Sequence, residues 1–415
     1  MSSSEKDQVK NADEEPAPKA AAAEGNKKRS GDVGEKKKDS ESQKLKDKKE
    51  GGSKKGAAEV KKAATKKVAE KPMPNVKEGE VVNNRFTIVK LLGAGGFGAV
   101  YEVDDAKTKQ KAAMKLELHK PPPDHPDLTL EMNVLRRVQK NVHFTRFIQN
   151  GVHRNIRYLV MQLVGRNLGD MRKSCPDKKF TYSSAHRSAM QMFEAIEHMH
   201  KVELLHRDIK PGNYAVGYTR GDVRMIYLLD FGLVRKYTAK NGKVRPQRAH
   251  APFRGTRRYA SPNMLKEIDS GRVDDLISWI YSVVECSIGN LPFPSTETNR
   301  KKLADIKLQV AEDAQGLFKD MHKIWRPIYD HLMKLKYADV PDYAMIRREM
   351  DGVLKEKKID FKRDPYDWEE EGGTFSKIIT QTMAKGPPKK SADEMKEKFA
   401  TGTTGKDTGG GAGVD

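Results

Sequence analysis

The stretch from Leu205 to Asp230 constrains the fold of this chain more than any other feature. It begins with His206-Arg207-Asp208-Ile209-Lys210-Pro211-Gly212-Asn213 and ends, after the pattern of a short strand-rich hairpin, at Asp230-Phe231-Gly232. Metal-assisted phosphoryl transfer needs a carboxylate to orient the attacking hydroxyl, a cation for the γ-phosphate and two oxygen ligands for magnesium. The segment supplies all four groups, and we predict these roles for Asp208, for Lys210, and for Asn213 with Asp230.

A glycine-rich turn lies upstream, with the sequence Gly93-Ala94-Gly95-Gly96-Phe97-Gly98. Glycines let backbone amides approach phosphate oxygens without a β-carbon in the way. A dinucleotide-binding fingerprint is the alternative, and Glu117 lies where its ribose-binding acid would be expected. However, apolar residues alternate with others from Ala99 to Val103, which is the period of a strand, whereas the dinucleotide motif opens a helix there. The pattern favours a hairpin that covers phosphate.

The next predicted strand, residues 111–118, carries a lysine among apolar neighbours, Lys115. Burying an ammonium group costs free energy unless the group is paired. The helix predicted over residues 127–138 places Glu131 on the same face as Leu135 and Val138. We therefore expect Lys115 and Glu131 to pair and to present the amine to ATP phosphates. Two unrelated surface charges are the alternative.

The wider pattern predicts one folded domain between two polar tails. Strand patterns recur over residues 147–152 and 156–163, and after Gly165 the periodicity becomes helical. We predict one folded domain over residues 85–372, divided into a sheet lobe, 85–163, and a larger helical lobe, 165–372, with the nucleotide in the cleft between them. Residues 1–80 are rich in Lys, Ala and Glu and are predicted to be disordered, and residues 376–415 to be flexible.

The motifs together resemble those of a protein kinase of the casein kinase I superfamily, and are most similar to those of the tau-tubulin kinases. The runs that carry the resemblance cover residues 85 to about 370 and are Met161-Gln162-Leu163-Val164-Gly165-Arg166-Asn167-Leu168, His206 to Asn213, Asp230-Phe231-Gly232-Leu233, Phe253-Arg254-Gly255-Thr256-Arg257-Arg258-Tyr259-Ala260-Ser261, Asp274-Asp275-Leu276, Pro341-Asp342-Tyr343 and Asp364-Pro365-Tyr366-Asp367-Trp368.

The resemblance implies a bilobal α+β protein kinase fold, with a small antiparallel-sheet lobe holding one helix and a larger, mainly helical lobe. It implies transfer of phosphate from Mg²⁺-ATP to serine or threonine of protein substrates, and an acid, Asp275, that braces the catalytic loop. Met161 matches the gatekeeper position, and Gln162 and Val164 match backbone contacts to adenine. The resulting nucleotide site comprises Leu92, Gly93, Ala94, Gly95, Gly96, Phe97, Gly98, Val100, Ala113, Lys115, Met161, Gln162 and Val164.

One departure from the family pattern is Ser261-Pro262-Asn263, where the family usually shows Ser-Ile-Asn. Proline fixes φ and removes an amide donor, so we expect the helix that starts there to differ locally. The position lies beneath the activation segment, and the substitution therefore bears on substrate docking. Since every catalytic position is filled, the pattern argues against a catalytically inactive relative.

Between Asp230 and Ser261 the chain carries nine basic residues and no acid. Guanidinium groups bind carboxylates and phosphates well. We therefore expect acidic or already phosphorylated protein substrates, with Arg254, Arg257 and Arg258 as the anion site, Arg258 matching a family arginine implicated in anion binding. A solvated basic loop, or a site for an autophosphorylated residue, is the alternative.

Composition limits the remaining possibilities. The chain has two cysteines and a formal net charge of +21, which favours a reducing compartment and acidic partners. The N-terminus lacks a signal-peptide core, and the most apolar run, Trp279 to Ile288, is about ten residues, too short to span a bilayer. We expect an intracellular, cytoplasmic monomer without membrane insertion, with nuclear import left open by the lysine runs.

Two other functional classes remain open from the sequence. The chain could be a pseudokinase scaffold that binds nucleotide without turnover. It could instead bind nucleic acid through its basic surface, but it shows no recognition-helix, zinc or aromatic-stacking signature. We therefore regard nucleic-acid binding as the weaker alternative.

Overall fold

The computed structural model describes residues 76–95, 98–118, 128–313 and 316–369. The predicted tails, except residues 76–80, lie outside these ranges, as do Gly96 and Phe97 of the glycine-rich turn. Within the described ranges, no helix combines the length and apolar character needed to cross a membrane.

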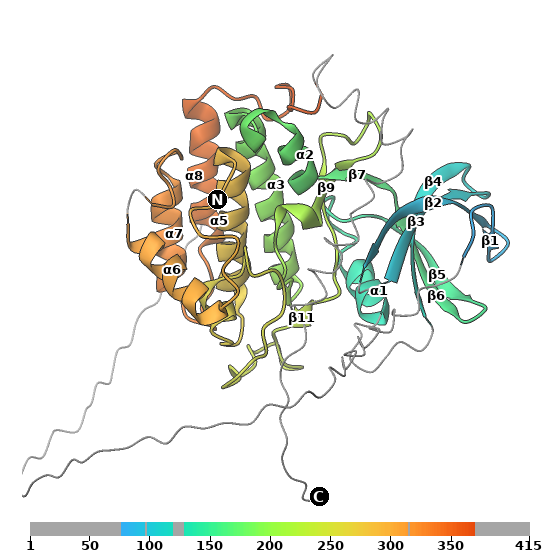
Figure 1. Cartoon of the computed structure of the whole chain (residues 1–415), viewed down its shortest axis with the longest axis horizontal. Helices are drawn as coiled ribbons and strands as arrows, with labels where there is room; N and C mark the ends of the chain where they lie inside the picture. Colours follow the sequence, from blue (N-terminus) through green and yellow to red (C-terminus); the bar gives the residue numbers. More distant parts are fainter. Residues whose placement is uncertain (1–75, 96–97, 119–127, 314–315, 370–415) are drawn as a thin grey trace, which may run out of the picture. The chain divides into compact units, whose positions relative to one another are not determined.

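The N-terminal part of the described chain forms an antiparallel sheet of six strands in the order β1-β2-β3-β4-β6-β5. The strands alternate outward polar and inward apolar residues, and the inward set builds a small core that includes Phe86, Met114 and Val160. Helix α1 lies beside this sheet (Figure 1). The elements are β1 (Val81–Val82), β2 (Phe86–Gly95), β3 (Gly98–Asp105), β4 (Gln110–Leu118), α1 (Leu128–Arg137), β5 (Phe147–His153) and β6 (Ile156–Gln162).

The rest of the described chain is mainly helical. Helices α3 and α5 pack against each other, and Trp279 of α5 donates a hydrogen bond to the Ala189 carbonyl of α3 at 3.0 Å. The helices are α2 (Leu168–Ser174), α3 (Tyr182–Lys201), α4 (Pro262–Leu265), α5 (Arg272–Ile288), α6 (Arg300–Glu312), α7 (Trp325–Lys334) and α8 (Tyr343–Glu356), with 3₁₀ turns at Pro176–Lys178 and Pro211–Asn213. The bilobal α+β fold predicted from the sequence is confirmed.

The mainly helical part also contains two small sheets. A three-stranded sheet runs in the order β10-β9-β7, and a two-stranded sheet joins β11 to β8. The β9–β10 hairpin, predicted ahead of Asp230, is antiparallel and pairs Tyr214 with Leu228. The strands are β7 (Val164–Asn167), β8 (Leu204–Leu205), β9 (Tyr214–Gly217), β10 (Ile226–Leu228) and β11 (Arg235–Lys236).

Pro262 occupies the first position of helix α4, where no intrahelical amide donor is required. Ser261 caps this helix by accepting a hydrogen bond from the Met264 amide at 3.1 Å. The proline therefore starts a short helix rather than disrupting one.

Candidate active site

Lys115 and Glu131 meet in the interior. Strand β4 contributes the lysine and helix α1 the glutamate, and the two side chains form a buried ion pair. Burial lowers the pKa of Lys115, but the opposite charges of Glu131 and Asp230 outweigh that effect and leave the pKa raised. Lys115 is therefore an ammonium group at neutral pH. It lies close enough to Asp230 for the charge of that carboxylate to raise its pKa.

The catalytic loop between β8 and the turn at Pro211–Asn213 is held by one carboxylate of helix α5. Asp275 accepts hydrogen bonds from the backbone amides of His206 and Arg207, both at 2.8 Å, and contacts His200 Nε2 at 3.1 Å. Arg207 has a φ of 66°, a left-handed conformation that costs free energy in a non-glycine residue. The charged acceptor on α5 helps to hold the loop in this conformation, as the sequence resemblance implied.

Asp208 lies at the centre of the predicted catalytic group. Its Oδ2 accepts from Lys210 Nζ at 2.5 Å and from Asn213 Nδ2 at 3.2 Å, while Lys210 also donates to Thr256 Oγ1 at 2.9 Å. Its Oδ1 is buried and has no hydrogen-bond partner within the described ranges. A buried carboxylate oxygen left unpaired is costly, and at a functional site it is an acceptor available to a substrate.

Gly255 keeps the approach to this free oxygen open. Its φ is +100°, and a β-carbon there would lie 2.6 Å from the Arg207 carbonyl oxygen and 3.3 Å from Asp208 Oδ1. Only glycine combines this backbone conformation with so close an approach.

Asp230 follows strand β10 and has a φ of 67°. The next residue, Phe231, is buried, and its ring lies 5.9 Å from that of His206 and 6.0 Å from that of Phe144. This packing holds the backbone at Asp230 in place. The Asp230 charge acts on Lys115, so the second predicted acid belongs to the same site as the lysine of β4.

These groups fit a magnesium-bound nucleotide. Asn213 uses its amide nitrogen to donate to the Asp208 carbonyl at 2.8 Å, which leaves the amide oxygen as the atom suited to a hard cation. Asp230 supplies a carboxylate, and the unpaired oxygen of Asp208 lies in the same loop. Oxygen ligands beside two ammonium groups are the donor set expected for Mg²⁺ and phosphates.

The predicted glycine-rich turn joins β2 to β3. Gly98 has a φ of +105°, and a β-carbon there would lie 2.1 Å from the Leu116 carbonyl oxygen. Gly95 pairs with Gly98 across the hairpin, Leu92 is half-buried, and Gly93 and Ala94 are exposed. A strand follows the turn, as the alternation from Ala99 predicted, so the local structure is not that of a dinucleotide fingerprint.

The remaining predicted nucleotide residues lie on neighbouring strands. Val100 is paired in register with Lys115, and Ala113 with Met161. The Gln162 side chain donates to Asp222 Oδ2 at 3.0 Å and to the Tyr227 hydroxyl at 3.2 Å. Val164 begins β7, which pairs with β9. The segment from Met161 to Val164 thus connects the six-stranded sheet to the helical part of the chain.

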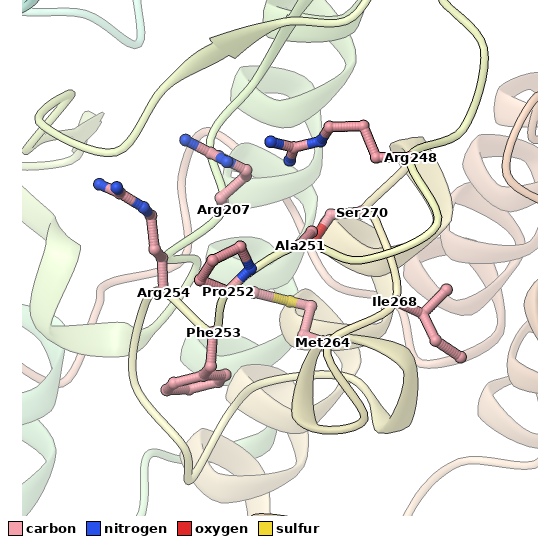
Figure 2. A pocket seen from close by; sticks show the side chains of 9 residues that line it. All are labelled: Arg207, Arg248, Ala251, Pro252, Phe253, Arg254, Met264, Ile268 and Ser270. Carbon is pink, nitrogen blue, oxygen red and sulfur yellow. The ribbon is translucent and has the colours of Figure 1, made fainter. Parts of the chain in front are cut away.

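The three arginines predicted as an anion site separate in the structure. Arg258 forms an ion pair with Glu285 of α5, with Nη2 at 2.7 Å from Oε1, and Arg257 donates to the Thr298 carbonyl. Arg254 lines a pocket that it shares with Arg207 and Arg248 (Figure 2). The prediction missed Glu285, because an acid 27 residues downstream gives no local signal that it neutralises an arginine.

Arg207 and Arg248 join Arg254 at this pocket because the activation segment, which carries Arg248 and Arg254, folds back on the catalytic loop, which carries Arg207. Figure 2 shows the guanidinium groups of Arg207, Arg248 and Arg254 on one side of it. Burial first, and then the charges of Arg254, Arg235 and Arg248, lower the pKa of Arg207 to about 10. Asp269 pairs with Arg235 and Arg248. Positive charge remains in excess, which favours an anion.

Comparison with known proteins agrees with this geometry. Residues 86–359 match the protein kinase domain model. The chain belongs to the protein kinase family. A probable serine/threonine-protein kinase of Dictyostelium discoideum is 34% identical over 296 residues, which cover 70% of this chain and 58% of that relative. The match therefore spans less than two thirds of the Dictyostelium kinase.

Two Caenorhabditis elegans relatives are 29% identical. One, named as a casein kinase I, aligns over 75% of this chain and 91% of its own length. The other, serine/threonine-protein kinase spe-6, aligns over 70% of this chain and 77% of its own length. The names of both relatives are those of protein kinases, and the first is that of a casein kinase I.

Proposed function

We propose that this kinase transfers the γ-phosphate of Mg²⁺-ATP to serine or threonine hydroxyls of protein substrates. The observation that carries the proposal is the buried, unpaired Oδ1 of Asp208, held in a loop with Lys210 and Asn213. The names of the relatives support the serine/threonine class. Within the family, the sequence motifs resemble those of the tau-tubulin kinases, and we propose that branch of the casein kinase I superfamily for residues 85–372.

The residues divide the work as follows in this proposal. Asp208 orients the substrate hydroxyl and takes up its proton at Oδ1, while Lys210 stabilises charge on the transferred phosphoryl group. Lys115, held by Glu131, positions the phosphates. Asn213 and Asp230 hold Mg²⁺, which neutralises phosphate charge when bound. The strands around Ala113 and the segment from Met161 to Val164 receive the adenine.

Asp208→Asn tests this assignment. We expect phosphorylation of a generic serine/threonine substrate such as casein to fall by at least about 10²-fold, because the amide cannot accept the proton. Nucleotide affinity, measured by fluorescent ATP-analogue binding, should be retained. Asp320→Asn, at an exposed position, is the matched control. Nucleotide binding by the wild type without any phosphotransfer would support the pseudokinase alternative, and activity unaffected by Asp208→Asn would contradict the mechanism.

We further propose that acidic or phosphorylated substrates are preferred, through Arg207, Arg248 and Arg254 rather than through Arg258. The support is the excess of guanidinium charge in the pocket and the ion pair that ties Arg258 to Glu285. Phosphate groups accept the fork of hydrogen bonds that a guanidinium donates.

Arg254→Gln tests the pocket with three peptides that differ only in carrying a phosphoserine, a glutamate or an alanine near the acceptor. We expect the kcat/KM advantage of the phosphorylated peptide over the neutral one to shrink about tenfold, because one charge-assisted contact is lost. Arg257→Gln is the control and should leave the preference intact. Equal turnover of the three peptides by the wild type would refute the preference but not the kinase activity.

A further inference from the structure

Helix α6 carries a buried lysine that no part of the mechanism above uses. Lys307 is 1% exposed, and its Nζ lies 3.1, 2.9 and 2.7 Å from the carbonyl oxygens of Arg257, Arg258 and Ala260. Three acceptors around one nitrogen require three N–H donors, which an ammonium group has and a neutral amine lacks. The contacts therefore define Lys307 as a buried cation bound to backbone.

Two aromatic rings complete the site. Nζ lies 4.6 Å from the centroid of the Tyr281 ring and 4.8 Å from that of Phe293. The faces of aromatic rings attract a cation, most strongly where water is excluded. Burial first, and then the charge of Arg258, lower the pKa of Lys307 well below its ordinary value. Against this effect, the three carbonyls and the two rings favour the charged form.

The backbone that Lys307 holds borders the catalytic carboxylate. Residues 255–261 begin with Gly255, which lies against Asp208, and Thr256, which accepts from Lys210. The segment therefore borders the free Oδ1 of Asp208, which a serine or threonine hydroxyl would approach. The three carbonyls bound by Lys307 belong to its second half.

The side chains of the same segment are fixed separately, by helix α5. Arg258 Nε and the Tyr259 hydroxyl donate to the two carboxylate oxygens of Glu285, at 2.8 and 2.5 Å. Helix α5 thus holds side chains of the segment, and Lys307 of helix α6 holds its main chain. The main-chain contacts set the path of the backbone whatever side chains it carries.

We propose that Lys307 is a positioning residue that shapes the peptide-docking surface of residues 255–261. It contacts neither the nucleotide site nor the reacting groups in the described chain, so it acts on protein substrate and not on ATP. The proposal rests on the phosphotransfer proposed above but not on the preference for acidic peptides.

Lys307→Met tests the proposal, since methionine has a similar length and no donor. With a serine peptide free of acidic residues, we expect the KM for peptide to rise about tenfold because the carbonyls lose their shared donor. The KM for ATP and the peptide-independent ATP hydrolysis should stay unchanged. Lys307→Arg, which keeps charge and donors, should restore part of the peptide affinity. Lys301→Met, at an exposed position of the same helix, is the matched control.

Phe293→Leu keeps the amine and removes one ring, so it extends the test if Lys307→Met does not fold. We expect a two- to threefold rise in the peptide KM, the size of a weakened cation–π contact, with the ATP KM unchanged. An unchanged peptide KM in the folded variants, or equal changes in both KM values, would overturn the positioning role while leaving the kinase proposal intact. No turnover by the wild type would overturn both.

Discussion

Two neighbouring acids of helix α5 show how strongly the surroundings of a residue decide its charge. Burial raises the pKa of both Asp274 and Asp275. In Asp275 the hydrogen bond and charge of His200 and the amides of the catalytic loop outweigh burial, and the pKa is lowered. In Asp274 the Ser261 hydroxyl and the Gly271 amide offset burial only in part, and the pKa is raised to about 6. Adjacent positions in the sequence thus have opposite shifts.

The raised pKa of Asp274 predicts a pH dependence of stability. The folded state binds the Asp274 proton more tightly than the unfolded chain, whose carboxyl has a pKa of about 3.9. The stability that this proton contributes to the fold is therefore fully present below pH ~4 and is lost as the pH rises through about 6. Asp274→Asn removes this titration. We expect the stability difference between wild type and variant to change by about 1.4 kcal/mol between pH 5 and 7, in favour of the variant at the higher pH.

Urea unfolding of both proteins at several pH values measures that difference. Asp305→Asn, at an exposed position of helix α6, serves as the control and should show a nearly constant difference. A constant difference for Asp274→Asn as well would show that Asp274 is ionised as readily in the folded state as in the unfolded one.

At the level of elements, the β2–β3 hairpin depends on one close contact with its neighbouring strand. Gly98 lies directly against the Leu116 carbonyl of β4, so the hairpin approaches β4 more closely than any side chain would allow. The same strand carries Lys115. The contact therefore sets the distance between the glycine-rich turn and Lys115, both of which are predicted to bind the ATP phosphates.

Gly98→Ala should disrupt this arrangement. The new methyl group meets a backbone oxygen that cannot rotate away, at a φ that alanine disfavours, and we expect a loss of about 2–3 kcal/mol in stability and a raised KM for ATP. Gly93→Ala is the control for stability, because a β-carbon there has no atom within 4 Å and its φ is not positive. Thermal unfolding and ATP titration check both, and equal behaviour of the two variants would contradict the close contact.

At the level of the whole domain, the segment before β5 links the six-stranded sheet to the catalytic acids. Phe144 forms a bridge with Leu228 of β10, and the His143 ring contacts the Ile226 carbonyl and Glu194 of α3. Strand β10 leads directly to Asp230. These contacts fix the second acid relative to the sheet that carries Lys115, although the two residues are far apart in the chain.

The sequence predicted the local structure well where a period or a spacing carried the information. Strand β4, predicted over residues 111–118, spans Gln110–Leu118, and helix α1, predicted over residues 127–138, spans Leu128–Arg137, since their apolar periodicity is strong. Helix α7 begins only at Trp325. Buried Leu317 and Phe318 give the turns before it an apolar pattern that a helix would share, so the start of this helix is hard to predict from sequence.

The sequence by itself determined the protein kinase family and the fold class, and it predicted the phosphoryl-transfer residues, because that chemistry requires particular groups at short and characteristic spacings. Only the tertiary structure decided which charges remain free. It pairs Arg258 with Glu285, gathers Arg207, Arg248 and Arg254 around one pocket, and buries Lys307 beneath the main chain beside the catalytic loop. Such pairings join residues distant in sequence, and the free energy of a charge depends on those neighbours.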